Sequence, residues 1–214
     1  MWIYDTELDR YARVTRSPGT SPSFSPDGNQ VVFQSDMGNA QGNFDLYIIN
    51  SDGKNLRKLL DTPEVNDGNP RFSPDGSQLL FISERAGTSE LYIYNLDDSS
   101  VNQLSELGMN MQQAEWSPDG SRIAFIAGTV ADERTGETAT DVYVIDADGS
   151  SNLSQFTDDQ MTNRDPAWSP DGRWIIFSSR SSGKGDLWVA ASDGSGNFQL
   201  TDDEFEDLMP DWAP

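Results

Sequence analysis

An aromatic residue followed by Ser-Pro-Asp-Gly occurs four times in this chain, and this phrase constrains the fold more than any other feature. The copies begin at Phe24, Phe72, Trp116 and Trp168, and Trp212-Ala213-Pro214 begins a fifth. The leading aromatics are 48, 44, 52 and 44 residues apart. This is the period expected for the four-stranded blades of a β-propeller.

The phrase predicts a tight corner between two strands. Proline fixes φ for the second position of a type I turn, aspartate accepts local backbone hydrogen bonds, and glycine supplies a positive φ. An apolar run follows each corner, at 31–33, 79–82, 123–126 and 175–177. A buried Phe or Trp removes roughly 150–250 Å² from water, worth about 4–6 kcal/mol as an upper bound. One such aromatic per repeat predicts a core between neighbouring blades.

Each complete repeat predicts four short strands bounded by Gly, Asn, Asp and Ser. They are expected near 22–25, 30–35, 44–50 and 56–60; 70–73, 78–83, 90–95 and 101–105; 113–117, 122–127, 141–146 and 153–157; and 166–169, 173–178, 186–191 and 197–201. Third strands share an acid-aliphatic-aromatic-aliphatic pattern that begins at Asp45, Glu90, Asp141 and Asp186. The alternate aliphatic side chains are expected to face neighbouring blades.

The repeats predict an all-β fold with a single propeller domain over 1–214, made of four complete four-stranded blades and a partial fifth. The blades are expected at 17–65, 66–109, 110–161 and 162–206. Outer strands of the partial blade are expected in 1–16 and its inner strand in 207–214, because Trp2 to Thr15 matches Trp188 to Thr201 in spacing. Its second strand is missing. A five-position ring, a segment of a longer propeller, and completion by another copy remain as explanations.

Composition narrows the class of partner. The chain is 35% hydrophobic and 10% aromatic, and it carries a formal charge of −22 from 36 acidic and 14 basic residues. Such a surface repels phosphate backbones and anionic membranes, so neither nucleic acid binding nor membrane insertion is expected. No apolar stretch approaches a membrane span, and no signal peptide opens the sequence.

The residue types that are missing restrict the chemistry. There is no cysteine and no histidine, which removes Ser-His-Asp and Cys-His nucleophilic sites and histidine-ligated zinc. No nucleophile elbow or phosphate-binding loop occurs. A glycosidase that uses two carboxylates remains an alternative. The chain has 36 acids, too many for their spacing to single out one catalytic pair. We therefore expect no catalytic residues.

Methionines mark the candidate binding site. Five of the six fall in predicted loops on one face of the propeller, where outer strands lead into the next inner strand and second strands lead into third strands. Flexible, polarisable Met suits surfaces that accept varied apolar ligands, although these side chains would also serve as packing that plugs the funnel. The site is expected to contain these methionines with acidic and basic neighbours: Met37, Asp67, Met109, Met111, Met161, Arg164, Asp165, Asp207 and Met209.

The sequence predicts no cofactor and no firm metal site. Asp146-Ala147-Asp148-Gly149-Ser150 resembles the start of a calcium loop, but its glycine comes two positions early and no Glu closes the loop. A turn between strands explains it better. Clustered acids such as Asp202-Asp203-Glu204 leave weak calcium binding open.

The repeat as a whole resembles a known family. The repeat resembles the WD-like propeller repeat of the TolB family. The resemblance lies in the inner aromatic with Ser-Pro-Asp-Gly, the aliphatic strand ending in Phe, a Ser with Arg nearby, Leu-Tyr or Leu-Trp, and a final Leu-Thr such as Leu200-Thr201. Propeller domains of prolyl oligopeptidase relatives share it. The resemblance implies a periplasmic or extracytoplasmic protein that binds proteins or peptides. TolB-like proteins typically have six blades and an additional α/β domain, and neither is found here.

Three hypotheses follow from these observations. The first is a non-catalytic TolB-like propeller that binds a protein or peptide at its loop-rich face. The second is the propeller portion of a larger peptidase or carbohydrate-active enzyme, and the third is a carboxylate-based glycosidase. Open blade edges would also allow a homo-oligomer.

Overall fold

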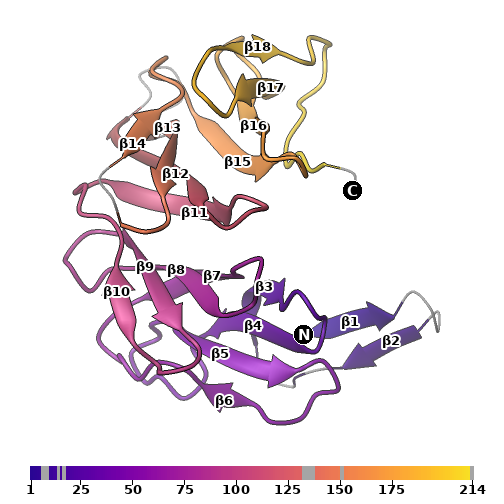
Figure 1. Cartoon of the computed structure of the whole chain (residues 1–214), viewed down its shortest axis with the longest axis vertical. Helices are drawn as coiled ribbons and strands as arrows, with labels where there is room; N and C mark the ends of the chain where they lie inside the picture. Colours follow the sequence, from indigo (N-terminus) through magenta and orange to yellow (C-terminus); the bar gives the residue numbers. More distant parts are fainter. Residues whose placement is uncertain (6–9, 14, 16–17, 132–137, 150–151, 213–214) are drawn as a thin grey trace. The chain divides into compact units, whose positions relative to one another are not determined.

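The computed structural model describes residues 1–5, 10–13, 15, 18–131, 138–149 and 152–212 (Figure 1). All of the secondary structure in those ranges is β-strand. A search of the same ranges finds no helix with the length and apolarity needed to cross a membrane. The chain forms two compact units, Met1–Gln103 and Leu104–Pro214, called the first and second units below.

The first unit contains two four-stranded antiparallel sheets and one pair of strands. The first sheet consists of β3 (Thr20–Phe24), β4 (Gln30–Ser35), β5 (Asp45–Asn50) and β6 (Arg57–Lys58). The second sheet consists of β7 (Asp67–Phe72), β8 (Gln78–Ser83), β9 (Glu90–Asn95) and β10 (Val101–Gln103). The pair is β1 (Trp2–Asp5) with β2 (Arg10–Arg13).

The second unit contains two more sheets of the same kind. The third sheet consists of β11 (Asn110–Trp116), β12 (Arg122–Ala131), β13 (Thr138–Asp146) and β14 (Leu153–Gln155). The fourth sheet consists of β15 (Asn163–Trp168), β16 (Trp174–Ser179), β17 (Asp186–Ala191) and β18 (Asn197–Gln199). In all four sheets, neighbours in sequence are neighbours in the sheet, which is the topology of propeller blades.

The predicted corners form in all four sheets. In the first, the Ser25 hydroxyl donates to Asp27 Oδ1 at 2.6 Å, and Gly28 N donates to Ser25 O at 2.8 Å with φ of 69° at the glycine. The Ser to Asp distance is 2.6, 2.6 and 2.7 Å in the other three copies. The Ser25 hydroxyl makes the largest contribution to lowering the pKa of Asp27 to about 2, and hydrogen bonds from Asn29 lower it further. Local chemistry alone therefore specifies this turn.

The predicted cores between sheets form within each unit. Phe72 of β7 packs in one cluster with Leu46 and Ile48 of the first sheet. Trp168 of β15 packs in the same way on Val142 and Val144 of the third sheet. The phenylalanines of the second strands, at 33, 81, 125 and 177, are among the most buried side chains. Alternate aliphatic residues of β5 and β13 thus face the neighbouring sheet, as the sequence predicts.

The inner strands begin two to three residues earlier than predicted in the first, second, third and fourth sheets. Each carries a register shift in its first half. In three of them a residue with positive φ lies at the shift: Ser21, Asn69 and Asp165. A β-bulge of this kind lets the strand continue past a residue that is not in the ladder.

The two terminal segments behave differently. The β1–β2 pair has the predicted outer-strand register, because Trp2 lies opposite Arg13 as Trp188 lies opposite Gln199. The inner strand predicted in 207–214 is not formed across the described residues 207–212. A strand needs a partner for its backbone groups, and no strand of the described chain pairs with these residues.

Candidate functional site

The ends of the sheets where the inner and third strands begin carry most of the loops, and we call this end the loop side. In the first unit it comprises loops 36–44, 59–66 and 84–89. In the second unit it comprises 104–109, 156–162, 180–185 and 200–206. An acid starts the third strand in the first, second and fourth sheets and lies beneath these loops. Asp45, Glu90 and Asp186 are at most 1% exposed, so their surroundings must satisfy a carboxylate.

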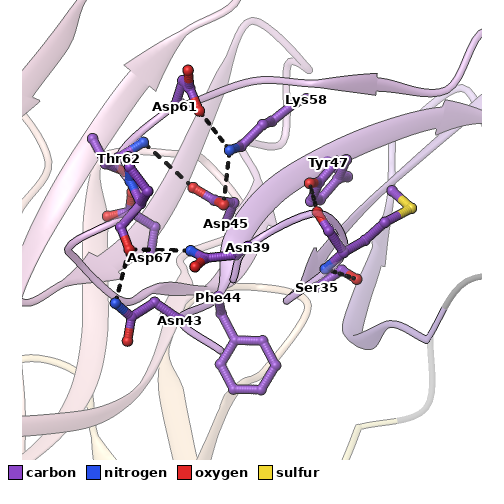
Figure 2. Close-up of polar contacts among 12 residues, drawn as sticks. Ser35, Asn39, Asn43, Phe44, Asp45, Tyr47, Lys58, Asp61, Thr62 and Asp67 are labelled. Atoms are coloured by element: carbon purple, nitrogen blue, oxygen red, sulfur yellow. Dashed lines mark hydrogen bonds and ion pairs between the residues drawn. The ribbon is translucent and has the colours of Figure 1, made fainter. Parts of the chain in front are cut away.

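Asp45 is held by groups from the strand and the loop that follow it (Figure 2). Its Oδ2 lies 2.9 Å from Lys58 Nζ, and the same ammonium group lies 2.7 Å from Asp61 Oδ1. Thr62 N donates to Asp45 Oδ1 at 3.4 Å. Partial burial lowers the pKa of Lys58, but hydrogen bonds to Asp61 and Asp45 outweigh it and raise the pKa above its ordinary value. This lysine therefore stays charged and fixes loop 59–66 to the first sheet.

Asp67 starts the inner strand β7 and is also fully buried. Arg85 Nη2 lies 2.8 Å from Asp67 Oδ1, and the Thr62 hydroxyl donates to Oδ2. The Arg85 guanidinium also lies over the Tyr92 ring, 4.9 Å from its centroid. A buried, charge-assisted pair that is stacked on an aromatic ring is rigid. It ties loop 84–89 to the start of β7.

Loops 36–44 and 59–66 are joined by side-chain amides. Asn39 Nδ2 and Asn43 Nδ2 both donate to Pro63 O, at 3.2 and 2.9 Å. Phe44 N donates to Asn66 Oδ1 at 3.1 Å, whereas the Phe44 side chain is 37% exposed. Figure 2 shows its ring pointing away from the polar contacts. The loops thus form an ordered base that presents one aromatic side chain.

The second unit builds its loop side mainly from neutral groups. Asn163, which starts β15, is fully buried and donates to Thr140 O at 2.7 Å and to the Thr157 hydroxyl at 3.2 Å. Thr157 in turn donates to Asp141 Oδ1 at 2.9 Å. Burial raises the pKa of Asp141, reinforced by the charge of Asp159 and only partly offset by the Thr157 hydrogen bond. Among the residues that the structure describes, no cation pairs with Asp141 as Lys58 pairs with Asp45.

In the fourth sheet, the buried Asp186 has both neutral and cationic partners. Asp186 accepts hydrogen bonds from the Ser182 hydroxyl and from Gln199 Nε2, the latter at 3.0 Å. Lys184 Nζ lies 3.4 Å from Asp186 Oδ1. Arg180 reaches the next segment, where its Nη2 lies 3.4 Å from Glu206 Oε1. The Arg180 contact ties loops 180–185 and 200–206 together.

A set of inner-strand side chains connects one sheet to the next within each unit. The residues three positions before each inner aromatic are Ser21, Asn69, Gln113, Asp165 and Met209. The Ser21 hydroxyl donates to Asn69 Oδ1 at 3.0 Å. Gln113 Nε2 donates to Asp165 Oδ1 at 2.6 Å, and Asp165 N donates back to Gln113 Oε1 at 2.7 Å. These positions were not recognised as a set from sequence, although counting back from each aromatic would have found them.

The predicted methionines do not share one environment. Met111 is 4% exposed and lies within β11 rather than in a loop, so its predicted loop position is wrong. Met37 packs against Val31, Phe33, Tyr47 and Ile49 of the first sheet. Met109 and Met161 lie in loops and are half-buried. Met209 is 77% exposed.

The predicted charged residues also separate into two groups. Asp67 is buried in its ion pair with Arg85, whereas Arg164 is exposed on β15. Asp165 is half-buried and hydrogen-bonded to Gln113. Asp207 is half-buried, and its backbone N donates to Gly185 O at 2.7 Å. Of the predicted residues, Met161 lies in loop 156–162, Arg164 and Asp165 lie in the first half of β15, and Asp207 and Met209 follow loop 200–206.

Sequence reasoning missed the residues that build the base of the loop side. Lys58, Asn163 and Gln113 connect elements through contacts that the chain reaches only after folding. The acids of the third strands were seen as a pattern, and that pattern was the signal for buried carboxylates. A search of the described residues for three or more grouped metal-binding side chains finds none.

A pocket of about 360 Å³ lies at the opposite end of the second unit, near the corners, and its lining includes Arg122, Asp146 and Asp193. Arg122 already has partners there. Its Cζ lies 4.8 Å from the centroid of the Trp168 ring, and its Nη1 donates to Ser192 O at 2.6 Å. None of the predicted site residues lines this pocket.

Comparisons with known proteins agree with this architecture. A family model described as the TolB beta propeller domain matches residues 1–214. The Tol-Pal system protein TolB of Francisella tularensis subsp. mediasiatica is 29% identical over 225 residues, which cover 100% of this chain and 49% of that protein. The crystal structure of TolB from Acinetobacter baumannii has the same fold, with a TM-score of 0.75 and 24% identity over 100% of this chain and 51% of that one.

A peptidase is also among the relatives. The uncharacterized peptidase YuxL of Bacillus subtilis is 27% identical over 185 residues, which cover 83% of this chain and 24% of the peptidase. The chain therefore spans about half the length of the TolB proteins it matches and about a quarter of this peptidase.

Proposed function

The chain belongs to the TolB β-propeller domain family, and from that premise we propose that it is a non-catalytic scaffold that binds a protein or peptide on its loop side. The observation that carries this proposal is the exposure of large apolar side chains on loops whose bases are fixed by hydrogen bonds. Phe205, Leu208 and Met209 are 66%, 44% and 77% exposed in one stretch of the second unit. Exposed apolar groups on a rigid support are typical of interaction sites.

The proposed contact residues are the exposed and half-buried members of the predicted set: Met109, Met161, Arg164, Asp165, Asp207 and Met209. Met37, Met111 and Asp67 have a supporting role, because their side chains pack or pair inside the sheets. With a net charge of −22, the protein favours a partner that carries basic as well as apolar residues, since complementary charge raises association rates.

The cellular setting follows from the same premise. We place the protein in the periplasm or another extracytoplasmic space, in keeping with the TolB relatives.

The two terminal segments would form one incomplete fifth blade, and its open edges would allow association of copies. Weak calcium binding at the acidic loops would be compatible with this role and is not required for it.

Site-specific crosslinking tests the binding side. The photoreactive amino acid benzoylphenylalanine is placed at Met209 or Phe205, and the chain is exposed to periplasmic extract of the source organism. We expect crosslinked adducts of defined mass from both positions. Trp174 is the matched control, because it is aromatic, 37% exposed and next to a corner at the opposite end of the sheet. Adducts from Trp174 alone, or from all three positions equally, would contradict the assignment.

A second candidate is favoured by the likeness to the Bacillus subtilis peptidase. In that case the domain would be the propeller portion of a larger peptidase or carbohydrate-active enzyme and would control substrate access. The parent reading frame decides between them. A hydrolase domain in the same frame would support the enzyme, and a TolB-type arrangement would support the scaffold.

A further inference from the structure

The pocket near the corners of the second unit lies between the third and fourth sheets. Its volume of about 360 Å³ falls in the range of roughly 300–1,000 Å³ found for small-molecule sites. One wall comes from β13 and β14, and the other comes from the turn that follows β17. Leu153 and Asp193 of its lining are exposed, so a ligand can reach the pocket from solvent.

The first unit shows why this space is open. Leu96 directly follows β9 of the second sheet and packs on a core that includes Ile48 of the first sheet. Ser192 directly follows β17 and holds the same position in the fourth sheet. Both backbone N–H groups donate to the residue just before the second strand of their sheet. Because serine is much smaller than leucine, the space that Leu96 fills in the first unit stays open beside Ser192.

Two side chains hold the walls of the pocket together. Arg122 is the first residue of β12, and its Nη1 and Nη2 donate to Ser192 O at 2.6 Å and to Ser192 Oγ at 3.2 Å. The Trp168 ring supports the guanidinium from one side. Asn197 Nδ2 makes a second link between the sheets, because it donates to Phe156 O at 3.5 Å. The pocket is thus preformed, and binding a ligand there costs little ordering of the protein.

Two carboxylates face the pocket from its opposite walls, Asp146 from β13 and Asp193 from the turn after β17. Asp146 Oδ2 accepts a hydrogen bond from Asn152 Nδ2 at 2.8 Å. Asp193 Oδ1 accepts one from Ser195 N at 2.9 Å. Both carboxylates are therefore held in place, and each has a second oxygen and further lone pairs with which to accept from a ligand.

The lining groups select among classes of ligand. An anion would be repelled by two carboxylates, and a cation would be repelled by the Arg122 guanidinium. An apolar molecule would take water away from both carboxylates at a cost in free energy. A hydroxyl group both donates and accepts, so a molecule with several hydroxyl groups can satisfy carboxylate, guanidinium and serine together. The apolar lining then receives its C–H face: Val144, Leu153 and Phe156.

We propose that this pocket binds a neutral monosaccharide unit. Its hydroxyl groups donate to Asp146 and Asp193 and accept from Arg122, and its C–H face packs on Phe156. The pocket lies at the opposite end of the sheets from the loop side of the proposed function. Loss of protein binding on the loop side leaves this site intact, so the two proposals are tested separately.

The test is a saturation-transfer difference NMR titration of the whole 214-residue chain with glucose, galactose, mannose and N-acetylglucosamine. We expect saturable binding of at least one of these sugars to a single site. Asp193→Asn should weaken that binding about tenfold or more, because a sugar hydroxyl loses a charged acceptor while the turn keeps a side-chain oxygen. Asp97→Asn is the matched control, since Asp97 is exposed and follows Leu96 as Asp193 follows Ser192.

Ser192→Leu tests the location of the site. This variant introduces the leucine that the second sheet has at the same position, so it should fill the pocket and abolish sugar binding. Circular dichroism checks that the variant is folded. Ser51→Leu is its control, because Ser51 directly follows β5 and holds the same repeat position in the first sheet. We expect Ser51→Leu to bind the sugar as the wild type does.

The source of the sugar is distinguished by the methyl glycoside of whichever sugar binds. Retained binding identifies a unit of a polysaccharide, and lost binding identifies a free sugar. Absence of saturable binding of all four sugars would overturn the proposal, as would equal affinity of the wild type, Asp193→Asn and Ser192→Leu. Saturable binding of glucuronate or 1,4-diaminobutane in place of the neutral sugars would also overturn it.

Discussion

Asp67 in the first unit and Asp207 in the second lie five residues before an inner-strand aromatic, yet their surroundings differ. Asp67 is fully buried and held by Arg85 and Thr62. Asp207 is half-buried, and its Oδ2 has no hydrogen-bond partner among the described residues. The same position in the repeat is thus an ion pair in one unit and has no such cation among the described residues in the other. The difference indicates that the repeat specifies where the carboxylate lies, whereas Arg85 determines how the charge of Asp67 is compensated.

Loss of Arg85 should have the largest effect on stability. Arg85→Ala leaves Asp67 buried without its cation, and we expect a loss of about 3–5 kcal/mol in the free energy of unfolding. Urea unfolding followed by circular dichroism measures it. Lys54→Ala is the control, because Lys54 and Asp52 form an exposed pair worth about 0–1 kcal/mol. Equal losses of stability for both variants would mean that the buried Arg85–Asp67 pair contributes no more than an exposed pair.

The two tryptophans at equivalent inner-strand positions extend the comparison to packing. Trp168 is 5% exposed between the third and fourth sheets, and Trp168→Ala should cost about 3–5 kcal/mol. Trp212 is half-buried on one sheet, so Trp212→Ala should cost about 2 kcal/mol. The same unfolding measurement checks both variants. A loss for Trp212→Ala as large as that for Trp168→Ala would show that the segment of Trp212 is as fully packed as β15.

Replacing Asp67 and Asp207 by asparagine should change the free energy of unfolding by different amounts and in different directions. Asp67→Asn removes the charge that balances Arg85 and should destabilise the protein by about 1–3 kcal/mol. Asp207→Asn removes a charge without a partner and should leave stability unchanged or slightly higher. Thermal unfolding at neutral pH compares them. A loss at Asp207 equal to that at Asp67 would mean that Asp207 is already paired in the folded protein.

The corner aspartates should show the smallest difference, because both units build the corner alike. The Ser25 hydroxyl lowers the pKa of Asp27, and the Ser169 hydroxyl lowers that of Asp171, both from 3.8 to about 2. A lowered folded-state pKa contributes stability above pH 3.8 that is lost as pH falls through about 2. Carboxyl NMR titration should give both midpoints near 2, and Ser25→Ala and Ser169→Ala should raise them similarly. Wild-type midpoints near 3.8 would contradict this.

The parts of the fold that local chemistry determines could be predicted from the sequence. The Ser-Pro-Asp-Gly corners form as expected, and β4, β8 and β9 have the predicted bounds. The early starts of inner strands could not be predicted, because positive φ at Asn69 and Asp165 is stabilised by hydrogen bonds that their backbone N–H groups donate to Gln34 and Gln113 in another sheet. These contacts exist only after the sheets have packed.

The candidate site was harder to predict than the fold. Met111 was expected in a loop, but it occupies the repeat position of Asp67 and Asn163 and is buried for that reason. Counting five residues back from each aromatic would have placed it correctly. The pairing of Asp45 with Lys58 and of Asp67 with Arg85 gives no signal in a single sequence, since many acids are available to each cation.

The most direct measurement is amide hydrogen exchange of the free chain at low protein concentration, comparing residues 67–72 with residues 207–212. The two segments hold the same place in the repeat, but only the first is paired with a second strand. We predict slow exchange in β7, close to the global unfolding limit, and fast exchange in 207–212. Equal protection of both segments, independent of concentration, would contradict this account, in which β8 protects β7 and no strand of the described chain pairs with 207–212.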